Sequence, residues 1–173
     1  MKKIKIFGIF IIFIFSFLCH FMFDWFPNSF FSILFPVNES IWEHMKLLVT
    51  PVLFFSIFEY IIYKRNNVYF NNFFLSYVIS TIVGIIFYLI IYLPIDYIYG
   101  HNAIFAISLL FFIFIVIQLI SYYIMNYTSV KYSNILGICL IVFIYIVFSY
   151  LTYNPIKNDI FFDTQKKMYG IPR

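Results

Sequence analysis

The sequence AIFAISLLFFIFIVIQLISYYIM at residues 103–125 decides the class of fold. It contains no Asp, Glu, Lys, Arg or His, and Gln118 is its only amide. A helix that crosses the hydrocarbon core of a bilayer needs about 20 consecutive, mainly apolar residues. This stretch is long enough, and it predicts a transmembrane helix.

Four other stretches share this character. Hydrophobic residues make up 64% of the chain and charged residues 10%, which excludes an ordinary soluble domain and a disordered chain. We expect an all-α, polytopic membrane helical bundle at residues 1–153. Its five transmembrane helices are predicted at about 6–25, 43–63, 72–95, 103–125 and 134–153, and a C-terminal tail follows at 154–173. The apolar segment 30–35 is too short to cross, so we expect it to lie at the membrane interface between spans one and two.

The distribution of basic residues predicts the orientation. Lys and Arg in short loops favour the cytoplasmic side of a membrane. With the N-terminus inside, that side receives Lys2, Lys3, Lys5, Lys64, Arg65 and Lys131. The basic residues of the tail oppose this orientation, but they carry less weight because the tail follows the last span. We therefore expect an N-in, C-out topology with an extracytoplasmic tail.

The overall composition also indicates the surroundings of the chain. The net charge of +4 comes from scattered residues rather than from a basic patch, which argues against a nucleic-acid partner. Abundant Phe, Tyr, Ile, Asn and Lys suggest an AT-rich genome. We expect a multi-pass protein of a bacterial cytoplasmic membrane, surrounded by the lipid bilayer. The oligomeric state is left open.

The most polar stretch is NESIWEHMK at residues 38–46. Ionisable residues next to hydrocarbon cost free energy, about 2.5–3.5 kcal/mol at mid-bilayer on one scale, so such a cluster is a functional-site hypothesis. The predicted topology brings other polar residues to the same outer face: His20 and Asp24 end the first span, Asp96 ends the third, and His101 precedes the fourth. This convergence predicts a shared site that opens outward.

Two kinds of chemistry suit these side chains. Imidazole nitrogen and carboxylate oxygen are common zinc ligands, so a divalent metal could be held by His20, Asp24, His44 and His101. The candidate catalytic residues are Glu43, Glu39 and Lys46, with Glu43 as the base that activates a metal-bound water. No organic cofactor is predicted. On one continuous helix, Glu39, Glu43 and Lys46 would share a face.

A structural explanation of the same residues competes with these roles. Ser40 and Glu43 fit the capping box that begins many helices, and Glu39 suits the positive end of a helix dipole. Elsewhere, Glu59 is expected to pair with Lys64 and Arg65 or to reach the inner headgroups, and Gln118 is expected to hydrogen-bond across helices. The tail is expected either to cover the outer face as a lid or to be disordered.

The stretch 38–46, with His20-Phe21 and Tyr169-Gly170-Ile171, resembles a family of small bacterial multi-pass membrane proteins of unknown function. The shared pattern is Asn-Glu-Ser-x-Trp-Glu-His-x-Lys. The resemblance implies a small helical membrane protein and supplies no activity. Ceramidase-like hydrolases fit less well because the HxxxH pair is absent. Intramembrane proteases of the CAAX-processing type fit less well because the Glu-Glu-x-x-x-Arg motif is absent.

Three classes of function follow, and whether the chain is an enzyme stays open. The first is a binding, accessory or immunity-type protein whose outer face recognises a protein or lipid partner. The second is a metal-dependent membrane hydrolase that acts on lipid or envelope substrates. The third is a cation or proton transporter.

Overall fold

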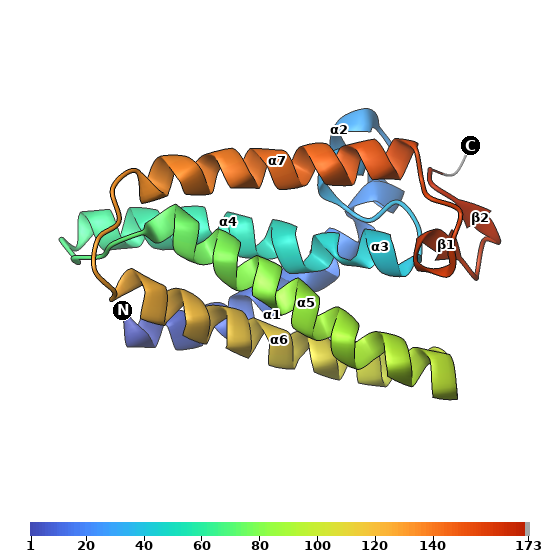
Figure 1. Ribbon diagram of the computed structural model, residues 1–173, viewed down its shortest axis with the longest axis horizontal. Helices are drawn as coiled ribbons and strands as arrows, with labels where there is room; N and C mark the ends of the chain where they lie inside the picture. The colour runs from blue at the N-terminus through green and yellow to red at the C-terminus, as the bar shows by residue number, and fades with distance from the viewer. Residues whose placement is uncertain (172–173) are drawn as a thin grey trace.

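The computed structural model describes residues 1–171, and most of them are helical (Figure 1). Residues 172–173 lie outside the described residues. The long helices are α1 (Lys2–Trp25), α4 (Lys46–Arg65), α5 (Phe73–Tyr99), α6 (Ala103–Met125) and α7 (Ser133–Tyr153). The short ones are α2 (Ser29–Leu34) and α3 (Ile41–His44). The tail contains a 3-10 turn (Asp159–Phe161) and the antiparallel strands β1 (Phe162–Asp163) and β2 (Met168–Tyr169).

Five helices are long and apolar enough to cross a membrane, which confirms the predicted number of spans. α3 and α4 together form one of them, Ile41–Arg65. The third runs past its predicted end at residue 95, to Tyr99, although it contains Pro94. α2 forms within the segment expected at the interface, and the Asn28 side chain caps it by accepting a hydrogen bond from the Phe31 backbone N–H, at 3.1 Å.

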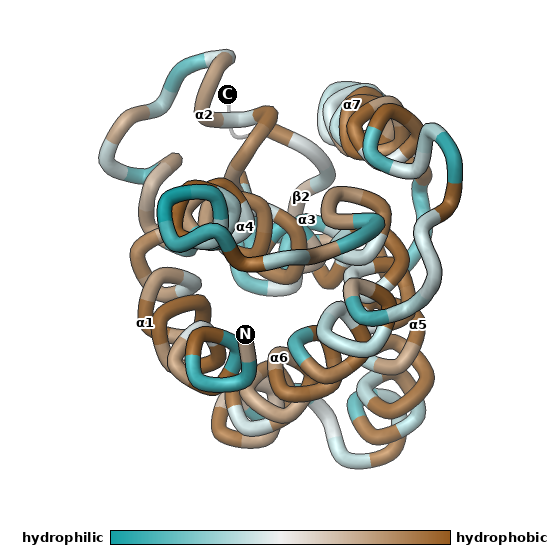
Figure 2. Tube along the Cα trace, turned by 90° about the vertical axis from the view of Figure 1, so that its left-hand side faces the viewer, coloured by the Kyte–Doolittle hydropathy of each residue, from teal (hydrophilic) through white to brown (hydrophobic). Residues whose placement is uncertain are grey.

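α4 is the central helix of the bundle. Of the apolar window in Ile41–Arg65, 61% is buried, against 17% in α7 and 28% in α1 and α6. α4 packs against α1 and α5, and Figure 2 shows that the long helices are mostly hydrophobic along their length. Many of their large apolar side chains are exposed on the outside of the bundle. An apolar outer surface is expected of a bundle whose solvent is lipid.

Small residues allow the helices around α5 to approach closely. A Cβ on Gly84 would lie 2.8 Å from the Ile117 side chain of α6, and a Cβ on Gly137 would lie 2.4 Å from the Leu75 backbone nitrogen. Ser76 and Ser80 are fully buried and donate to carbonyls of their own helix. Small residues at such contacts are typical of membrane helix packing.

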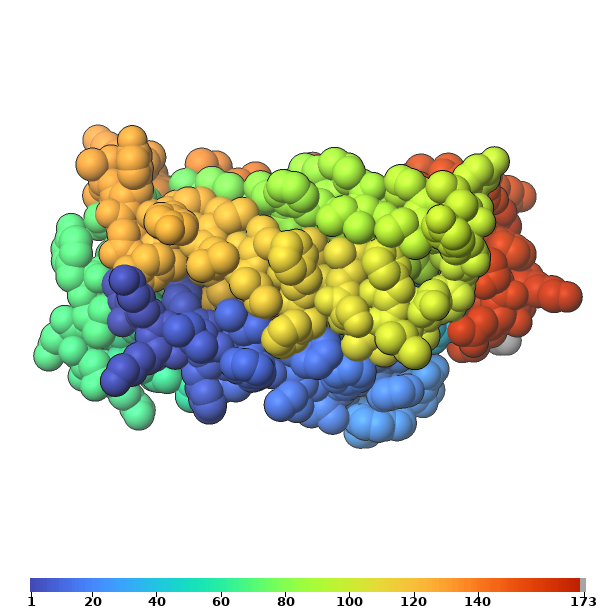
Figure 3. All heavy atoms as spheres, turned by 90° about the horizontal axis from the view of Figure 1, so that it is seen from below, coloured from blue at the N-terminus to red at the C-terminus, as the bar shows by residue number. Residues whose placement is uncertain are grey.

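The five crossings place the N-terminus and the tail at opposite ends of the bundle (Figure 1). The tail end is formed by the end of α1, by α2 and α3, by the α5–α6 connection and by the end of α7. Figure 3 shows the tail beyond the ends of α1, α5 and α6. The opposite end carries Lys64 and Arg65 in the last turn of α4 and Lys131 in the α6–α7 connection.

Residues 154–171 of the tail are folded against α3. This arrangement agrees with the expectation of a lid rather than with that of a disordered tail. The Phe161 ring stacks on Trp42, with ring centroids 4.8 Å apart. The Asn38 side-chain amide donates to the Gly170 carbonyl at 2.7 Å. Both contacts attach the tail to the polar stretch 38–46.

A buried ion pair joins α1 to α4 near the N-terminal end. Lys5 Nζ lies 2.9 Å from Glu59 Oε2, and both side chains are at most 5% exposed. The expectation that Glu59 pairs with Lys64 and Arg65 was therefore wrong. Glu59 faces the interior of the bundle, whereas Lys64 and Arg65 are exposed at the end of α4.

Candidate metal centre

The local structure of residues 38–46 separates its two acids. Ser40 is the N-cap of α3, since its Oγ accepts a hydrogen bond from the Glu43 backbone N–H at 3.3 Å. The reciprocal half of the capping box is absent, because the Ser40 N–H donates to Asn38 Oδ1 instead, at 2.9 Å. Glu39 thus precedes the helix and does not share a face with Glu43 and Lys46, which corrects the single-helix expectation.

Glu43 and Lys46 form a buried ion pair, with Lys46 Nζ 2.6 Å from Glu43 Oε2 and side-chain exposures of 0% and 2%. Lys46 Nζ also donates to the Ser32 carbonyl at 2.7 Å and to Thr152 Oγ1 at 2.9 Å. The Thr152 hydroxyl donates to Glu43 Oε1 at 2.6 Å. These bonds connect α2, α3, α4 and α7.

Because its carboxylate oxygens are occupied by buried partners, Glu43 has no free oxygen to receive a proton from a water molecule. A general base must reach the proton that it abstracts. A structural role therefore suits Glu43 and Lys46 better than the catalytic role predicted for them.

His20, Glu39 and His44 converge from α1, from the loop before α3 and from the end of α3. His20 Nε2 and His44 Nε2 are 3.2 Å apart. Glu39 Oε2 lies 3.6 Å from His20 Nε2 and 3.4 Å from His44 Nε2, and the three side chains are 26–29% exposed. Within residues 1–171 this is the only group of three His, Cys, Asp or Glu side chains whose ligand atoms lie within 4.8 Å of one another.

These distances match the spacing of ligands around a metal ion. Zinc binds imidazole nitrogen and carboxylate oxygen at about 2.0–2.1 Å, and the corners of a tetrahedron of that size are about 3.3–3.4 Å apart. The three separations in the structure, 3.2, 3.4 and 3.6 Å, bracket this value. One ion could therefore contact all three atoms with small movements of the side chains.

The hydrogen bonds around His44 orient its ring as a ligand. His44 Nδ1 lies 2.9 Å from the Ser40 carbonyl, and because a carbonyl only accepts, Nδ1 carries the proton of this bond. A neutral ring then has its lone pair on Nε2, which points at the cluster. Histidines that bind metals commonly donate their other N–H in this way. His20 Nδ1 is buried and has no hydrogen-bond partner among the described residues.

The two imidazoles also set the charge of Glu39. The adjacent imidazole rings, His20 first and then His44, hold the pKa of the Glu39 carboxyl well below its usual range, against the opposing effect of partial burial. Glu39 is therefore an anion at physiological pH. An anionic carboxylate with two imidazoles is a suitable donor set for a divalent transition metal.

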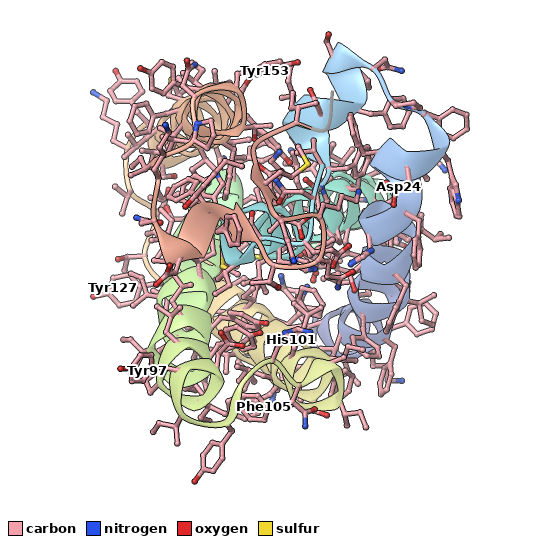
Figure 4. The ribbon with its side chains drawn as sticks, turned by 90° about the vertical axis from the view of Figure 1, so that its right-hand side faces the viewer. Asp24, Tyr97, His101, Phe105, Tyr127 and Tyr153 are labelled. Atoms are coloured by element: carbon pink, nitrogen blue, oxygen red, sulfur yellow. The ribbon has the colours of Figure 1, made fainter. Side chains whose placement is uncertain are left out.

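Two residues predicted as metal ligands lie outside this cluster, although at the same end of the bundle (Figure 4). The Asp24 side chain is exposed on the last turn of α1 and makes no bond to His20 among the described contacts. His101 is exposed, and its Nδ1 lies 2.8 Å from the Tyr92 hydroxyl and 3.9 Å from Asp96 Oδ1. The candidate metal centre is thus His20, Glu39 and His44, with Glu39 as a ligand rather than the catalytic residue predicted.

Asp163 is a residue of this site that the sequence did not indicate. It is fully buried, and its Oδ2 accepts a hydrogen bond from the Glu39 backbone N–H at 3.0 Å. Nothing in the spacing of a tail acid 124 positions away marks it as a neighbour of Glu39.

The chain belongs to a family of unknown function, DUF6512, whose model matches residues 1–171. The family assignment covers the motif 38–46, the five long helices and the described part of the tail. A search of curated proteins and a search of solved structures found no significant match. The function has to be inferred from the site itself.

Proposed function

We propose that this DUF6512 protein binds a divalent transition-metal ion through His20, Glu39 and His44, at the extracytoplasmic face of a bacterial cytoplasmic membrane. The observation that carries the proposal is the convergence of two Nε2 atoms and one carboxylate oxygen within 3.2–3.6 Å of one another. Zinc is the ion that this nitrogen and oxygen donor set suits best.

The placement at the outer face rests on the two ends of the bundle. The cluster lies at the tail end, whereas Lys64, Arg65 and Lys131 lie at the opposite end. The positive-inside rule assigns that basic end to the cytoplasm. α2 is amphipathic in its contacts, since Ser32 packs inward while Phe30 is exposed, which suits a position at the membrane surface.

The site leaves room for a fourth ligand. Structural zinc sites usually have four protein ligands, whereas catalytic sites have three and hold water in the fourth position. Three protein ligands with side chains about a quarter exposed favour an exchangeable water, and this supports a metal-dependent hydrolase as the second candidate function. In such an enzyme the metal would lower the pKa of its bound water, and the adjacent membrane surface would supply lipid or envelope substrates.

The transporter hypothesis receives less support. It requires a polar path from the cluster to the cytoplasmic side near Glu59 and Gln118. Both Glu59 oxygens are occupied by hydrogen-bond donors, and Glu59 and Gln118 are at most 1% exposed. The site therefore fits binding at one face better than passage through the bundle.

Metal content of the purified protein tests the proposal. We expect about one equivalent of zinc or another divalent ion, measured by ICP-MS after purification without chelators, because one tetrahedral site needs one ion. His20→Ala and His44→Ala should each abolish it. His101→Ala is the matched control and should keep the metal, since His101 contacts Tyr92 and Asp96 instead.

A wild-type protein that binds no metal, even after incubation with zinc, would contradict the proposal. The cluster would then be a hydrogen-bonded surface that recognises a protein or lipid partner at the outer face. The accessory or immunity-type hypothesis would take precedence, and the His44→Ala variant would be tested for loss of that partner.

A further inference from the structure

The tail holds the backbone of the polar stretch at two adjacent residues. Asp163 of β1 accepts a hydrogen bond from the Glu39 N–H, and the carbonyl of Gly170, just after β2, accepts one from the Asn38 side chain. On the other side of Glu39, Trp42 stacks on Phe161. The tail therefore contacts the chain before, at and after a proposed metal ligand.

The two oxygens of Asp163 have different tasks. Oδ1 accepts hydrogen bonds from the Gln165 and Lys166 N–H groups, at 2.8 and 2.9 Å, and so forms the turn between β1 and β2. Oδ2 accepts only from the Glu39 N–H, at 3.0 Å. The carboxylate is fully buried and has no cation among its hydrogen-bond partners in residues 1–171. One side chain thus folds the hairpin and attaches it to the loop that presents Glu39.

Glu39 depends on this attachment more than the two histidines do. His20 belongs to a long helix and His44 to the helix that leads into α4, whereas Glu39 lies in the loop before the N-cap. Its backbone N–H donates to the tail and to no other group among the described contacts. Residues that orient a metal ligand typically change metal affinity by about 10–100-fold when they are mutated.

We infer that Asp163 is a positioning residue for the ligand Glu39, and that docking of the C-terminal tail is coupled to metal binding. The inference rests on the proposed metal site. If the docked tail raises metal affinity by some factor, bound metal must stabilise the docked tail by the same factor, because binding linkage is reciprocal. A metal ion at this face would then control whether the tail is docked or released.

Asp163→Asn isolates the proposed link. An asparagine keeps the Oδ1 acceptor for the turn, but its NH₂ group cannot accept from the Glu39 N–H. We expect its zinc affinity, measured in detergent by competition with a chromophoric chelator, to fall about tenfold. Asp159→Asn is the matched control: it makes the same change in an exposed tail residue whose side chain makes no hydrogen bond or ion pair among the described contacts, and should bind zinc like the wild type.

Limited trypsin digestion gives a second readout. If Asp163 had only a structural role, the rate of digestion would not depend on zinc. Lys166 and Lys167 lie in the turn of the hairpin, which Asp163 holds closed through the Gln165 and Lys166 N–H groups. A protease binds its substrate as an extended chain, so we expect cleavage there to require opening of this turn. We expect saturating zinc to slow cleavage at these two positions about tenfold in the wild type, by the same linkage, and to have little effect in Asp163→Asn. Phe161→Ala, which weakens tail docking through Trp42 without touching Asp163, should lower zinc affinity in the same direction.

The outcomes separate the two proposals. A wild-type protein that binds zinc, together with Asp163→Asn and Phe161→Ala variants that bind it equally tightly, would overturn the coupling and leave the metal site standing. A wild-type protein that binds no zinc would overturn both. If Asp163→Asn did not fold, as judged by size-exclusion chromatography, Phe161→Ala and the zinc dependence of wild-type digestion would decide the question.

Discussion

The bundle contains two polar clusters that differ in how completely their atoms are bonded. At the N-terminal end, Glu59 accepts hydrogen bonds from Lys5, Tyr63 and Tyr77, and Lys5 also donates to Ser121 at 2.9 Å. At the tail end, His20 and His44 direct their Nε2 atoms at each other and at Glu39. The first cluster is buried, whereas the second is about a quarter exposed.

The difference shows how a structural cluster can be told from a ligand site. The Lys5–Glu59 cluster pairs opposite charges with hydroxyl donors, so its charges are satisfied within the protein, as buried charges must be. The cluster of His20, Glu39 and His44 brings together three groups that can all act as acceptors, and such groups gain most from a cation between them. Both clusters contain ionisable residues of membrane helices, and only the second calls for a ligand.

The largest expected effect comes from breaking the first cluster. Lys5→Met should lower the free energy of unfolding by about 3–5 kcal/mol, because it leaves the buried Glu59 without its cation. The thermal stability of the variant in detergent checks this. Lys3→Met, at an exposed position of the same helix, should leave stability unchanged. A Lys5→Met/Glu59→Met double variant should recover most of the loss, and failure to recover would mean that the pair is not the cause.

A second effect compares two acids four residues apart. Glu39→Gln should weaken zinc binding by about 100-fold. Loss of a residue that only orients a metal ligand typically costs about 10–100-fold, and here a ligand itself is changed. Glu43→Gln should keep the affinity within about threefold and lower thermal stability, since Glu43 is the buried partner of Lys46. Calorimetric zinc titration and thermal unfolding measure the two effects. Equal affinities in the two variants would remove Glu39 from the site.

The smallest effect concerns pH. Zinc should be released as the pH falls from about 7 to about 5, the range in which free imidazoles gain protons that compete with the metal. Since the pKa of Glu39 lies well below its usual range, its carboxylate stays charged there, and any stability it contributes is lost only at lower pH. The midpoint of zinc release, followed with a chelator dye, should lie at a higher pH in Glu39→Gln, because a site with about 100-fold lower affinity loses its zinc at a lower proton concentration. An unchanged midpoint in this variant would mean that Glu39 does not hold the metal.

The spans were predictable because each is a local property of composition. Residues 103–125 contain enough apolar side chains to cross a bilayer in any arrangement, and the observed α6 begins and ends there. The Ser40 cap was equally local, since it needs only the N–H of a residue three positions on. Predictions of side-chain partners were less successful, because the observed partner can lie on another helix. Glu59 pairs with Lys5 rather than with Lys64 and Arg65, and Gln118 is buried without a hydrogen-bond partner in residues 1–171.

The sequence by itself determined that this is a five-span helical membrane protein with an unusually polar stretch at 38–46, because apolar length and charge placement are read along the chain. Only the tertiary structure decided which polar residues form one site. It joined His20 to Glu39 and His44, left Asp24 and His101 outside, and brought Asp163 from the tail to the backbone of Glu39. The physical reason is that a hydrogen bond or a metal ligand must lie within a few ångströms of its partner, and such distances depend on how helices pack and where the loop before α3 turns.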